Sequence, residues 1–534
     1  MFDVIVVGSG ITGGLAAKEL TEKGLKTLVL ERGRAIEHII DYHDEPLELA
    51  PLQPWELQRH KTQSKCYAFD RASMRYFADD VDNPYVQVRP YDWIRSYQLG
   101  GRSLVWARHC VRWGPGDFLA NLNDGTGIDW PLRYEDLAPW YEYVERFVGV
   151  SGSTEGNPEV PDGVFLPPLP MNEVERHFKT CVERHIVHRR VFSARLANLT
   201  EALDGRGPCK ERDLCNRGCP NAGYFNSITA SLPAAQKTGN LQIRTDAVVE
   251  SILFDADTGL ATGVRFIDAK TREAVDVRAK LIFLNAGALD STKILLNSKS
   301  ERFKSGLGND SDQLGRNLMD HNYRIQVHAE FNELGDIPNP PGHPGGFYIP
   351  RFQNLERLSD TRSYLRGFAY SGQAFKSAGT SSKQRWKMVV VAMGETLPNP
   401  SNRVRLSDNL KDKCRIPQLE IECKYGQNEL AMLSDMKSEA EKMLRVAGFV
   451  KIEAFDTEQS PGLSAHEMGT ARMGRDPSTS VLNKYNQIHS VPNVFVTDGA
   501  CMASSACQNP SLTYMAITAR ACKHAVEELK KGYL

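Results

Sequence analysis

The hydrophobic pattern of the chain begins with its first residues. Residues 2–7 form an apolar run, interrupted only by Asp3, of the length expected for one buried parallel strand. Residues 11–23 carry the apolar period of a helix, and residues 27–30 form a second short apolar run. A strand, a helix and a strand in this order predict a βαβ unit with two parallel strands.

A glycine-rich turn joins the first predicted strand to the helix. Gly8 would make the tight turn, Gly10 would let the backbone approach a pyrophosphate, and Gly13 would let helix and strand pack closely. The helix N-terminus would attract phosphate, and Glu31, which ends the second strand, would bind a ribose hydroxyl. This fingerprint predicts dinucleotide binding without separating FAD from NAD. The alternative is a glycine-rich turn in an ordinary α/β protein.

Buried-strand character returns twice further along the chain. Residues 281–288 form an apolar run with a glycine turn that leads into a helix over about 290–296, and residues 494–499 form another. Residues 241–277, which precede both of these runs, are expected to form a small antiparallel meander. The nucleotide-binding sheet would therefore collect its strands from three stretches, which are residues 1–33, 240–290 and 490–534.

A different pattern covers residues 323–423. Runs that alternate or are rich in β-forming residues are separated by Gly/Pro segments, and a long helix over about 427–447 follows. The predicted fold class is α/β, with a discontinuous Rossmann-like dinucleotide-binding domain and an α+β substrate domain built on a mostly antiparallel sheet. The predicted limits are 1–165, 195–325 and 456–534 for the first domain, with a lid-like segment at 34–95 and a cysteine loop at 205–226, and 166–194 and 326–455 for the second.

Size and charge exclude several classes of protein. The 534 residues exceed one typical domain, and the net charge of −1 gives no reason to expect nucleic acid as a partner. No run approaches the ~18 apolar residues of a membrane-spanning helix, so we expect no direct insertion into a membrane. The first strand starts at residue 2, which leaves no room for a signal peptide, and a cytoplasmic location is expected from this sequence alone.

Three of the eleven cysteines lie close together in the sequence. Cys209, Cys215 and Cys219 have the spacing C-x5-C-x3-C in a polar loop, while the others are scattered, which argues against a disulfide framework. Three thiolates in one loop are able to ligate an iron–sulfur cluster, whereas zinc would normally need a fourth ligand. The alternative is three free or partly disulfide-linked cysteines in a surface loop.

Several separated motifs resemble those of the glucose–methanol–choline (GMC) family of FAD-dependent oxidoreductases, over nearly the whole chain. Within that family the chain looks closest to sugar and polyol dehydrogenases and pyranose oxidases. The motifs are the N-terminal fingerprint, GGRSLVW at 100–106, LGRNLMDH at 314–321, HEMGTARMG at 466–474 and VTDGA at 496–500.

The resemblance implies how FAD would be bound. The adenine half would lie against the fingerprint glycines and Glu31, with Val248 meeting the adenine through its backbone. Gly100, Gly101 and Ser103 would lie along the flavin, and Asp498 would meet the ribityl–pyrophosphate region. Pyranose 2-oxidases carry the flavin covalently on a histidine at the position of Val105, so noncovalent FAD is expected here.

The resemblance also implies the catalytic residues. His466 would take the proton of an alcohol while flavin N5 takes the hydride, and Asn509 would hold the same oxygen. Taken alone, Asn509 before Pro510 is an ordinary helix N-cap signature, and a histidine in a glycine-rich loop is usually not catalytic. We expect His321 and His489 to be structural.

The predicted activity is oxidation of a secondary hydroxyl of a sugar or glycoside, with C3 of a glucoside favoured. The cysteine spacing resembles that of glucose and fructose dehydrogenase catalytic subunits, where a 3Fe–4S cluster passes electrons to a cytochrome partner. A small subunit carrying the signal would then permit a periplasmic location. The alternatives are an oxygen-using pyranose or glycoside oxidase, a gluconate or polyol dehydrogenase, and a flavin-binding protein without turnover.

Overall fold

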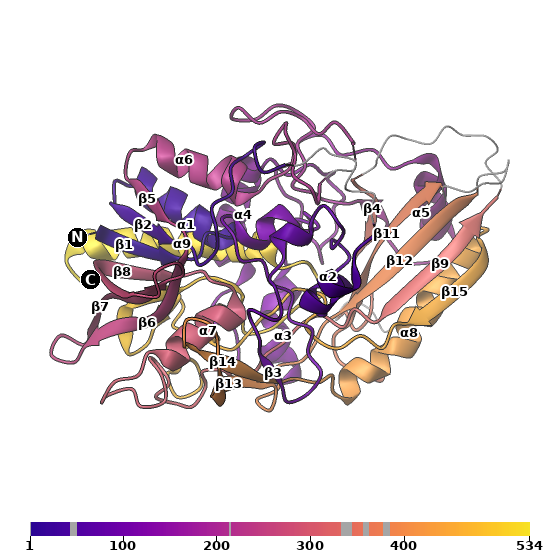
Figure 1. The fold of residues 1–534 in the computed structure, drawn as a ribbon. Coiled ribbons are helices and arrows are strands. Elements are labelled where there is room, and N and C mark those ends of the chain that lie inside the picture. Colours follow the sequence, from indigo (N-terminus) through magenta and orange to yellow (C-terminus); the bar gives the residue numbers. More distant parts are fainter. Residues whose placement is uncertain (1, 43–50, 213–214, 333–343, 356–361, 377–384) are drawn as a thin grey trace.

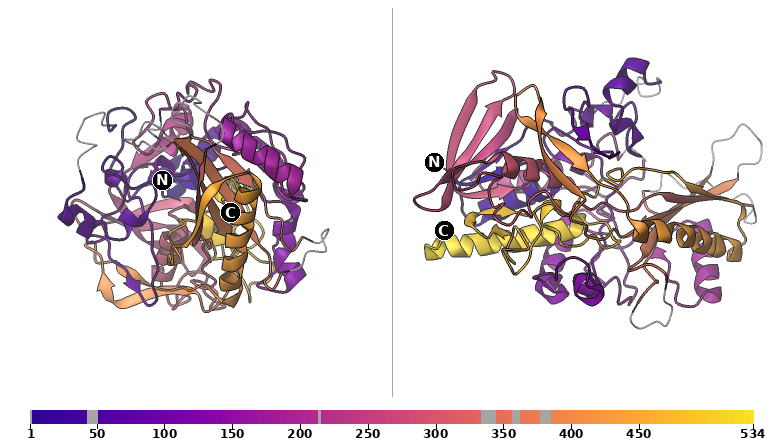
Figure 2. Two further views of the ribbon diagram at one scale, coloured as in Figure 1. Left: turned by 90° about the vertical axis from the view of Figure 1, so that its right-hand side faces the viewer. Right: turned by 90° about the horizontal axis from the view of Figure 1, so that it is seen from below.

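The computed structural model describes residues 2–42, 51–212, 215–332, 344–355, 362–376 and 385–534. Two sheets lie at opposite ends of an elongated molecule, and long connecting segments fill the space between them (Figure 1). Both chain termini lie at the same end, beside the sheet that contains the first strand (Figures 1 and 2). No described helix is long and apolar enough to cross a bilayer.

The sheet at the N-terminal end is mainly parallel, which confirms the predicted fold class. Its order is β16–β17–β8–β1–β2–β5, and all neighbours except β16 and β17 are parallel. Helices α1 and α9 pack against each other beside it, and α6 packs on α1. The elements are β1 (Phe2–Val7), α1 (Ile11–Glu22), β2 (Thr27–Leu30), α6 (Leu232–Lys237), β5 (Leu241–Arg244), β8 (Ala274–Leu284), β16 (Gln487–Ile488), β17 (Val491–Val496) and α9 (Ser511–Lys531).

Strand β8 belongs to two sheets at once. Its first half pairs with β7 (Leu260–Asp268), which pairs with β6 (Ala247–Asp255), and this antiparallel meander was predicted. Its second half lies between β1 and β17, where Phe283 stacks on Phe495 at 4.7 Å. The sequence suggested two strands here, because the exposed first half alternates and the buried second half is continuously apolar.

Strand β5 corrects one prediction. We expected it in the meander, but it pairs in parallel with β2 at the edge of the main sheet. Its four residues alternate between half-buried and exposed, and that pattern is expected for an edge strand of either sheet. The alternation therefore identified a strand without identifying its partner.

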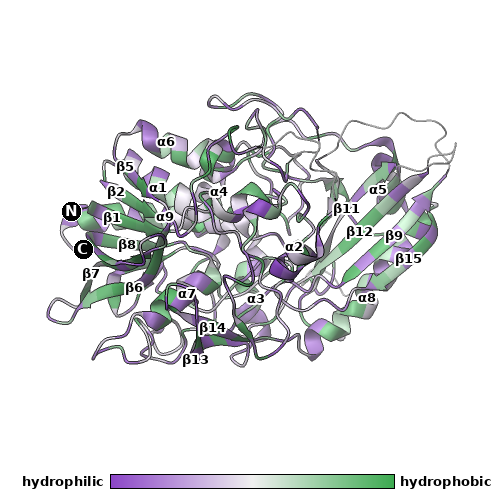
Figure 3. Cartoon of the chain, viewed as in Figure 1, coloured by the Kyte–Doolittle hydropathy of each residue, from purple (hydrophilic) through white to green (hydrophobic). Residues whose placement is uncertain are grey.

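The second sheet is antiparallel, as predicted, with the order β15–β9–β12–β11–β10–β4. Helices α5 and α8 cover one face, and the apolar side chains of these helices and of the strands form one core. Figure 3 shows the strands of both sheets as mainly hydrophobic. The elements are α5 (Glu173–His185), β4 (Phe192–Ser193), β9 (Ile325–Phe331), β10 (Phe347–Ile349), β11 (Phe368–Lys376), β12 (Trp386–Gly394), α8 (Gln427–Val446) and β15 (Val450–Asp456).

The alternation of β12 places two different surfaces on the two faces of this sheet. Met388, Val390 and Ala392 face the helices and belong to the core. Val389, Val391 and Met393 face the interior of the molecule, where they line a cavity. The antiparallel sheet therefore forms a wall on the side facing the parallel sheet.

A third, smaller sheet does not follow the predicted domain limits. Strands β13 (Arg403–Lys411) and β14 (Pro417–Glu422) form a hairpin that pairs with β3 (Val86–Gln87) and packs on α7 (Ala288–Asn297). We assigned the hairpin to the substrate domain, but its buried residues belong to the core of the parallel sheet. The alternating sequence does not show which core a hairpin joins. The division into two domains stays a prediction.

The remaining helices lie around the connections. Helix α4 spans Tyr134–Val148, and a π-turn at Ser227–Ser231 leads into α6. Helices α2 (Pro54–Arg59) and α3 (Pro115–Asp124) are shorter. The lid-like segment at 34–95 contains α2 and short turns, and part of it packs over the cavity.

Replacement of Gly13 by alanine is expected to destabilise the fold. The added Cβ would lie 2.0 Å from the carbonyl oxygen of Gly8, which is backbone and has no room to move. We expect Gly13→Ala to lower the free energy of unfolding of the cofactor-free protein by about 2 kcal/mol. Denaturant titration measures this, and an unfolding midpoint equal to that of the wild type would contradict it.

Candidate active site

Four parallel strands end at one level. Val7 of β1 pairs with Leu30 of β2 and with Leu284 of β8, and Leu284 pairs with Val496 of β17. The next residue of each strand therefore begins a loop at the same edge of the sheet, which is where open α/β sheets bind ligands. These four residues are Gly8, Glu31, Asn285 and Thr497.

A cavity of about 500 Å³ extends from this edge to the inner face of β11 and β12. Most of the residues predicted to bind cofactor or substrate line it. They are Gly8, Gly10, Glu31, Gly101, Ser103, Val248, His466, Asp498 and Asn509. Gly13 and Gly100 lie behind its wall.

The fingerprint glycines each have a distinct steric environment. Gly8 has a φ of +92°, which strongly favours glycine, and Gly13 lies against the backbone of Gly8. Gly10 differs, because a Cβ added there would meet no protein atom within 4 Å. It lines the cavity at the start of α1 and supplies no side-chain cap to that helix. This geometry fits a phosphate group lying against Gly10.

The second glycine turn lies directly against the first. A Cβ added to Gly101 would be 3.4 Å from the Cα of Gly10. Gly100 has a φ of +87°, and its N–H donates to the hydroxyl of Ser9 at 2.9 Å. The Ser103 hydroxyl donates to the carbonyl of Gly100 at 2.5 Å. Two turns far apart in sequence therefore form one continuous glycine surface beside the cavity.

Glu31 is held by three hydrogen bonds. It accepts from the hydroxyl and the N–H of Ser9 at 2.6 and 3.2 Å, and from the N–H of Gly33 at 2.9 Å. Burial raises the pKa of Glu31 above its ordinary value, while these donors act in the opposite direction. The carboxyl group is fixed at the wall of the cavity, and its contact with a ribose stays a prediction.

Asp498 ties the C-terminal loop to the turn after β8. Its carboxylate accepts from the hydroxyl of Ser291 at 2.5 Å and from the N–H groups of Gly287 and Ala500 at 3.0 Å each. Burial raises its pKa to about 6. The buried amide oxygen of Asn285 has no hydrogen-bond partner among the described residues. This unmatched acceptor and the open Gly10 both fit a bound dinucleotide.

His466 and Asn509, the predicted catalytic pair, come together at the cavity. The Nε2 atom of His466 lies 3.4 Å from the Nδ2 atom of Asn509. The backbone N–H of His466 donates to Asp320 at 3.0 Å, and its Nδ1 atom lies 3.0 Å from Nδ1 of His321. The Nδ1 edge of the His466 imidazole therefore contacts His321, and its Nε2 edge lies at the cavity beside the side-chain amide of Asn509.

The environment of His466 keeps its imidazole uncharged at neutral pH. Burial lowers the pKa of His466 well below its ordinary value. The neighbouring His321, Arg102 and His109 lower that pKa further. A buried neutral imidazole is able to accept a proton from a hydroxyl group.

The N-cap interpretation of Asn509 is wrong. Helix α9 begins at Ser511, and Pro510, with φ −86° and ψ −10°, occupies the N-cap position without a side-chain cap. The side chain of Asn509 turns toward His466 instead, and its buried Oδ1 has no partner among the described residues. The sequence signature located the helix start but missed the position by one residue.

His321 has a contact that the sequence did not predict. We expected a structural role, which stays a prediction, and the structure places its ring edge-on to that of His466, with centroids 4.9 Å apart. The signal was present in the sequence, because His321 ends the motif at 314–321. His489 instead lies 3.0 Å from the hydroxyl of Ser480 and does not line the cavity.

The far wall of the cavity contains residues that the sequence did not single out. His109 lines it with a buried Nδ1 that has no partner among the described residues, and burial lowers its pKa to about 4. The segment 34–95 contributes Tyr67, and the antiparallel sheet contributes side chains of β11 and β12. Only the alternation within β12 was readable in the sequence.

The cysteine loop lies outside the cavity. The sulfur of Cys209 accepts from the N–H of Glu211 at 3.4 Å, and that of Cys219 from the N–H of Gly223 at 3.3 Å. Within the described ranges, which omit residues 213–214, no three potential metal ligands are gathered. None of the eleven cysteines is in a disulfide. Among the described residues, Cys209, Cys215 and Cys219 are therefore neither gathered as metal ligands nor linked by a disulfide.

Two family models, both described as GMC oxidoreductase, match the chain, one over residues 2–323 and the other over residues 398–518. The chain is 28% identical to the 2-methyl-1,2-propanediol dehydrogenase of Mycolicibacterium austroafricanum, over 97% of this chain and 94% of that protein. It is 28% identical to the paromamine 6'-oxidase of Streptomyces fradiae, over 99% and 92%. It is 27% identical to the fructose dehydrogenase large subunit of Gluconobacter japonicus, over 99% and 98%.

A solved structure shares the fold. The crystal structure of pyridoxine 4-oxidase from Mesorbium loti matches with a TM-score of 0.62 over 98% of both chains, at 19% sequence identity. At that identity the likeness concerns the fold alone.

Gly10→Ala is expected to separate cofactor binding from stability. Since no atom lies within 4 Å of the added methyl group and the φ of −64° is ordinary, the unfolding midpoint of the cofactor-free protein should change little. The methyl group would project toward the cavity, so affinity for FAD should fall at least about tenfold, which is ~1.4 kcal/mol. Fluorescence titration with FAD measures this.

Gly13→Ala is the matched control for this experiment. It should lower the stability of the cofactor-free protein, whereas Gly10→Ala should weaken only FAD binding. An unchanged FAD affinity in Gly10→Ala would show that no phosphate lies against this turn.

Proposed function

Because the chain belongs to the GMC oxidoreductase family, we propose that it oxidises a secondary hydroxyl of a sugar or glycoside, with C3 of a glucoside favoured. The family membership predicted from the motifs is confirmed, and proteins of this family bind FAD. The substrate, the position oxidised and the noncovalent state of FAD are proposals.

The observation that supports the proposal is the meeting of His466 and Asn509 at the cavity that begins at the glycine turns. A substrate hydroxyl beside both side chains would receive a hydrogen bond from Nδ2 of Asn509 and donate its own hydrogen to Nε2 of His466. As the carbon loses a hydride, the hydroxyl proton passes to Nε2. His466 is then the general base, and Asn509 holds the oxygen that becomes the carbonyl.

Bound FAD would supply the hydride acceptor at N5 of its flavin ring. The residues that would hold it are Gly10 at the pyrophosphate, Glu31 at the ribose, Val248 at the adenine and Asp498 near the ribityl chain. Val105, buried at the cavity wall, offers no nucleophile for a covalent link. This supports a noncovalent cofactor.

The wall opposite the glycine turns supports a sugar as the substrate. The cavity lining combines the buried, unmatched Nδ1 of half-buried His109 with apolar side chains such as Val391 and Met393. A pyranose presents hydroxyl groups at its rim and C–H groups on its ring faces, so both kinds of surface find a counterpart. The named relatives include a fructose dehydrogenase and an aminoglycoside-type oxidase, so the choice of C3 depends on the sequence resemblance alone.

The electron acceptor is a separate proposal. The relatives include both an oxidase and dehydrogenases, so an oxygen-using pyranose or glycoside oxidase and a gluconate or polyol dehydrogenase stay as alternatives. A flavin-binding protein without turnover is the alternative outside enzymes of this class. If electrons leave the flavin through the cysteine loop, we also propose a cytochrome as the electron acceptor, a small subunit as a partner, and co-export of the two subunits to the periplasm.

The spacing of Cys209, Cys215 and Cys219 predicts iron and labile sulfide in proportion to FAD. Since the structure does not gather these three thiols, we derive no electron route through a cluster. Iron and sulfide analysis of anaerobically purified protein measures this, with Cys215→Ser as the variant that should lose the metal. A flavin spectrum with no iron would contradict the cluster.

Anaerobic mixing of the FAD-loaded protein with a series of glycosides, free sugars and polyols tests the proposed activity. We expect at least one sugar to bleach the flavin absorbance. His466→Gln should slow this bleaching on the order of 10²- to 10⁴-fold, because a general base is lost. FAD content should stay unchanged.

His489→Gln is the matched control, because His489 does not line the cavity. It should bleach at the wild-type rate. Wild-type bleaching in His466→Gln would remove this residue from the mechanism, and no bleaching by any alcohol would favour the non-catalytic alternative.

A further inference from the structure

The buried imidazole of His321 and the half-buried imidazole of His466 contact each other through nitrogen atoms of the same kind. The Nδ1 atoms of His321 and His466 are 3.0 Å apart. A neutral imidazole carries hydrogen on one nitrogen only, so in a hydrogen bond between two of them one Nδ1 donates and the other accepts. The direction of this bond decides which nitrogen of His466 faces the substrate without a hydrogen.

The other nitrogen of His321 fixes that direction. Its Nε2 lies 3.3 Å from the carbonyl oxygen of Ser505, and a carbonyl oxygen accepts hydrogen bonds but never donates them. Burial lowers the pKa of His321 to about 4, so the ring is neutral near pH 7. With its single hydrogen on Nε2, His321 has a bare Nδ1 that accepts. The hydrogen between the two rings therefore belongs to Nδ1 of His466.

We propose that His321 is a positioning residue that selects the tautomer of His466, leaving Nε2 of His466 bare toward Asn509 and the substrate. Its catalytic consequence rests on the proposed function, while the tautomer itself is a property of the protein alone. In the opposite tautomer Nε2 would carry a hydrogen and would be unable to accept the hydroxyl proton. His321 would thus act through His466 without touching the substrate.

The orientation of Asn509 agrees with this tautomer. Its amide nitrogen, which donates hydrogen bonds, lies 3.4 Å from Nε2 of His466, and its oxygen has no partner among the described residues. If Nε2 carried a hydrogen, the amide oxygen would be the favourable group at that place. In this tautomer Nδ1 of His466 donates to Nδ1 of His321, and Nε2 of His466 accepts from the amide nitrogen of Asn509.

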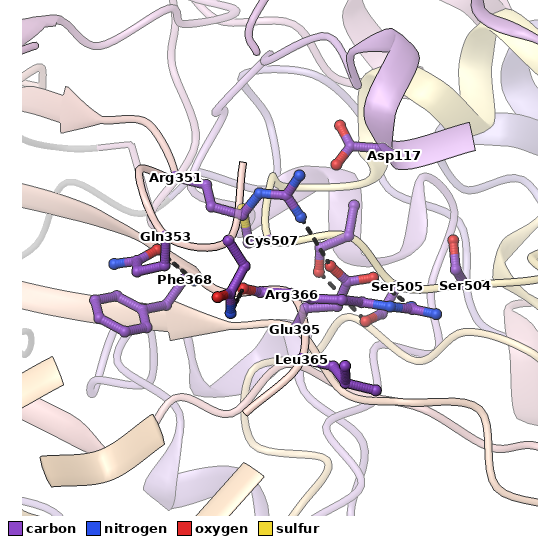
Figure 4. A network of polar contacts seen from close by, with 12 residues as sticks. Asp117, Arg351, Gln353, Leu365, Arg366, Phe368, Glu395, Ser504, Ser505 and Cys507 are labelled. Atoms are coloured by element: carbon purple, nitrogen blue, oxygen red, sulfur yellow. Dashed lines mark hydrogen bonds and ion pairs between the residues drawn. The ribbon is translucent and has the colours of Figure 1, made fainter. Parts of the chain in front are cut away.

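A buried polar network holds the carbonyl that directs His321. The hydroxyl of Ser505 exchanges two hydrogen bonds of 3.0 Å with the backbone of Thr396. The adjacent Glu395 pairs with Arg366 at 2.7 Å, and Arg366 also pairs with Asp124 at 2.7 Å. Figure 4 shows Arg366 and Glu395 beside the loop that contains Ser504 and Ser505. The Ser505 carbonyl is therefore held in place by the hydrogen bonds of Ser505 to Thr396, next to the ion pairs of Glu395 and Arg366.

The acceptor behind His466 is neutral, and this has a chemical consequence. When Nε2 takes the hydroxyl proton, His466 becomes a cation whose Nδ1–H still donates to His321. Among the described residues no carboxylate is hydrogen-bonded to the imidazole ring, since Asp320 accepts from the backbone N–H of His466 and Glu467 pairs with Arg102. The nearby His109 and Arg102 add no negative charge. The protonated base is therefore weakly stabilised and should release its proton readily to water after turnover.

Nitrogen-15 NMR of histidine-labelled FAD-bound protein tests the tautomer directly. The resonances of His466 and His321 are identified among the 13 histidines by their loss in His466→Gln and His321→Asn. We expect a protonated Nδ1 and a bare Nε2 on His466, and the reverse on His321. A protonated Nε2 on His466 would overturn the proposal. The result does not depend on turnover, so it stands apart from failure of the proposed function.

Two variants test the consequence. His321→Leu fills a similar volume without an acceptor, and should slow flavin bleaching on the order of 10²-fold while the substrate concentration for half-saturation changes little. His321→Asn keeps an acceptor near the Nδ1 position and should recover most of the rate, with Nε2 of His466 bare in the NMR spectrum.

Equal rates in wild type and His321→Leu would contradict a positioning role. If His321→Leu fails to fold, the NMR spectrum of the wild type and the rate of His321→Asn still test whether His321 sets the tautomer of His466. Loss of rate in His321→Asn with an unchanged His466 tautomer would assign His321 a merely structural role.

Discussion

The structure depends on the alignment of four strand ends. Val7, Leu30, Leu284 and Val496 lie in register, so loops from widely separated parts of the chain start at one edge. Asp498 then binds the turn after β8, and the adjoining loop continues to Asn509. A shift of one residue in any of these pairs would reverse the side chains and separate the glycine turns from the catalytic loop.

The second sheet completes the site by closing it. Its helix-covered face supplies stability, and its inner face forms the wall opposite the glycine turns. Enclosure reduces the exposure of His466 to solvent, and the same burial lowers the pKa of that imidazole. One arrangement therefore accounts for both the shape of the cavity and the uncharged state of its base. The family to which the chain belongs acts on alcohols through FAD, and this geometry suits that chemistry.

The sequence predicted the features that depend on neighbouring residues, namely the glycine turns and the strands. Gly8 and Gly13 were readable because turn geometry and close packing leave no alternative residue. Gly10 was readable from its place in the fingerprint, and the strands were readable from alternation and apolar runs. The partner of β5 and the core joined by β13 and β14 were not, because alternation specifies a face without specifying a neighbour. The contact of His321 with His466 was not predicted, and that of Asn509 was expected only from the family resemblance. These contacts join residues 145 and 43 positions apart, and no local rule reports such a contact.

The central claim is that this cavity removes a hydride from a ring carbon of a sugar beside His466. Its most direct test is the anaerobic reduction of bound FAD by a glucoside that carries deuterium at C3, compared with the same glucoside deuterated at C2 or C4. The account predicts slower flavin reduction with the C3-deuterated compound only. Equal reduction rates for all three compounds, or no reduction by any of them, would contradict it.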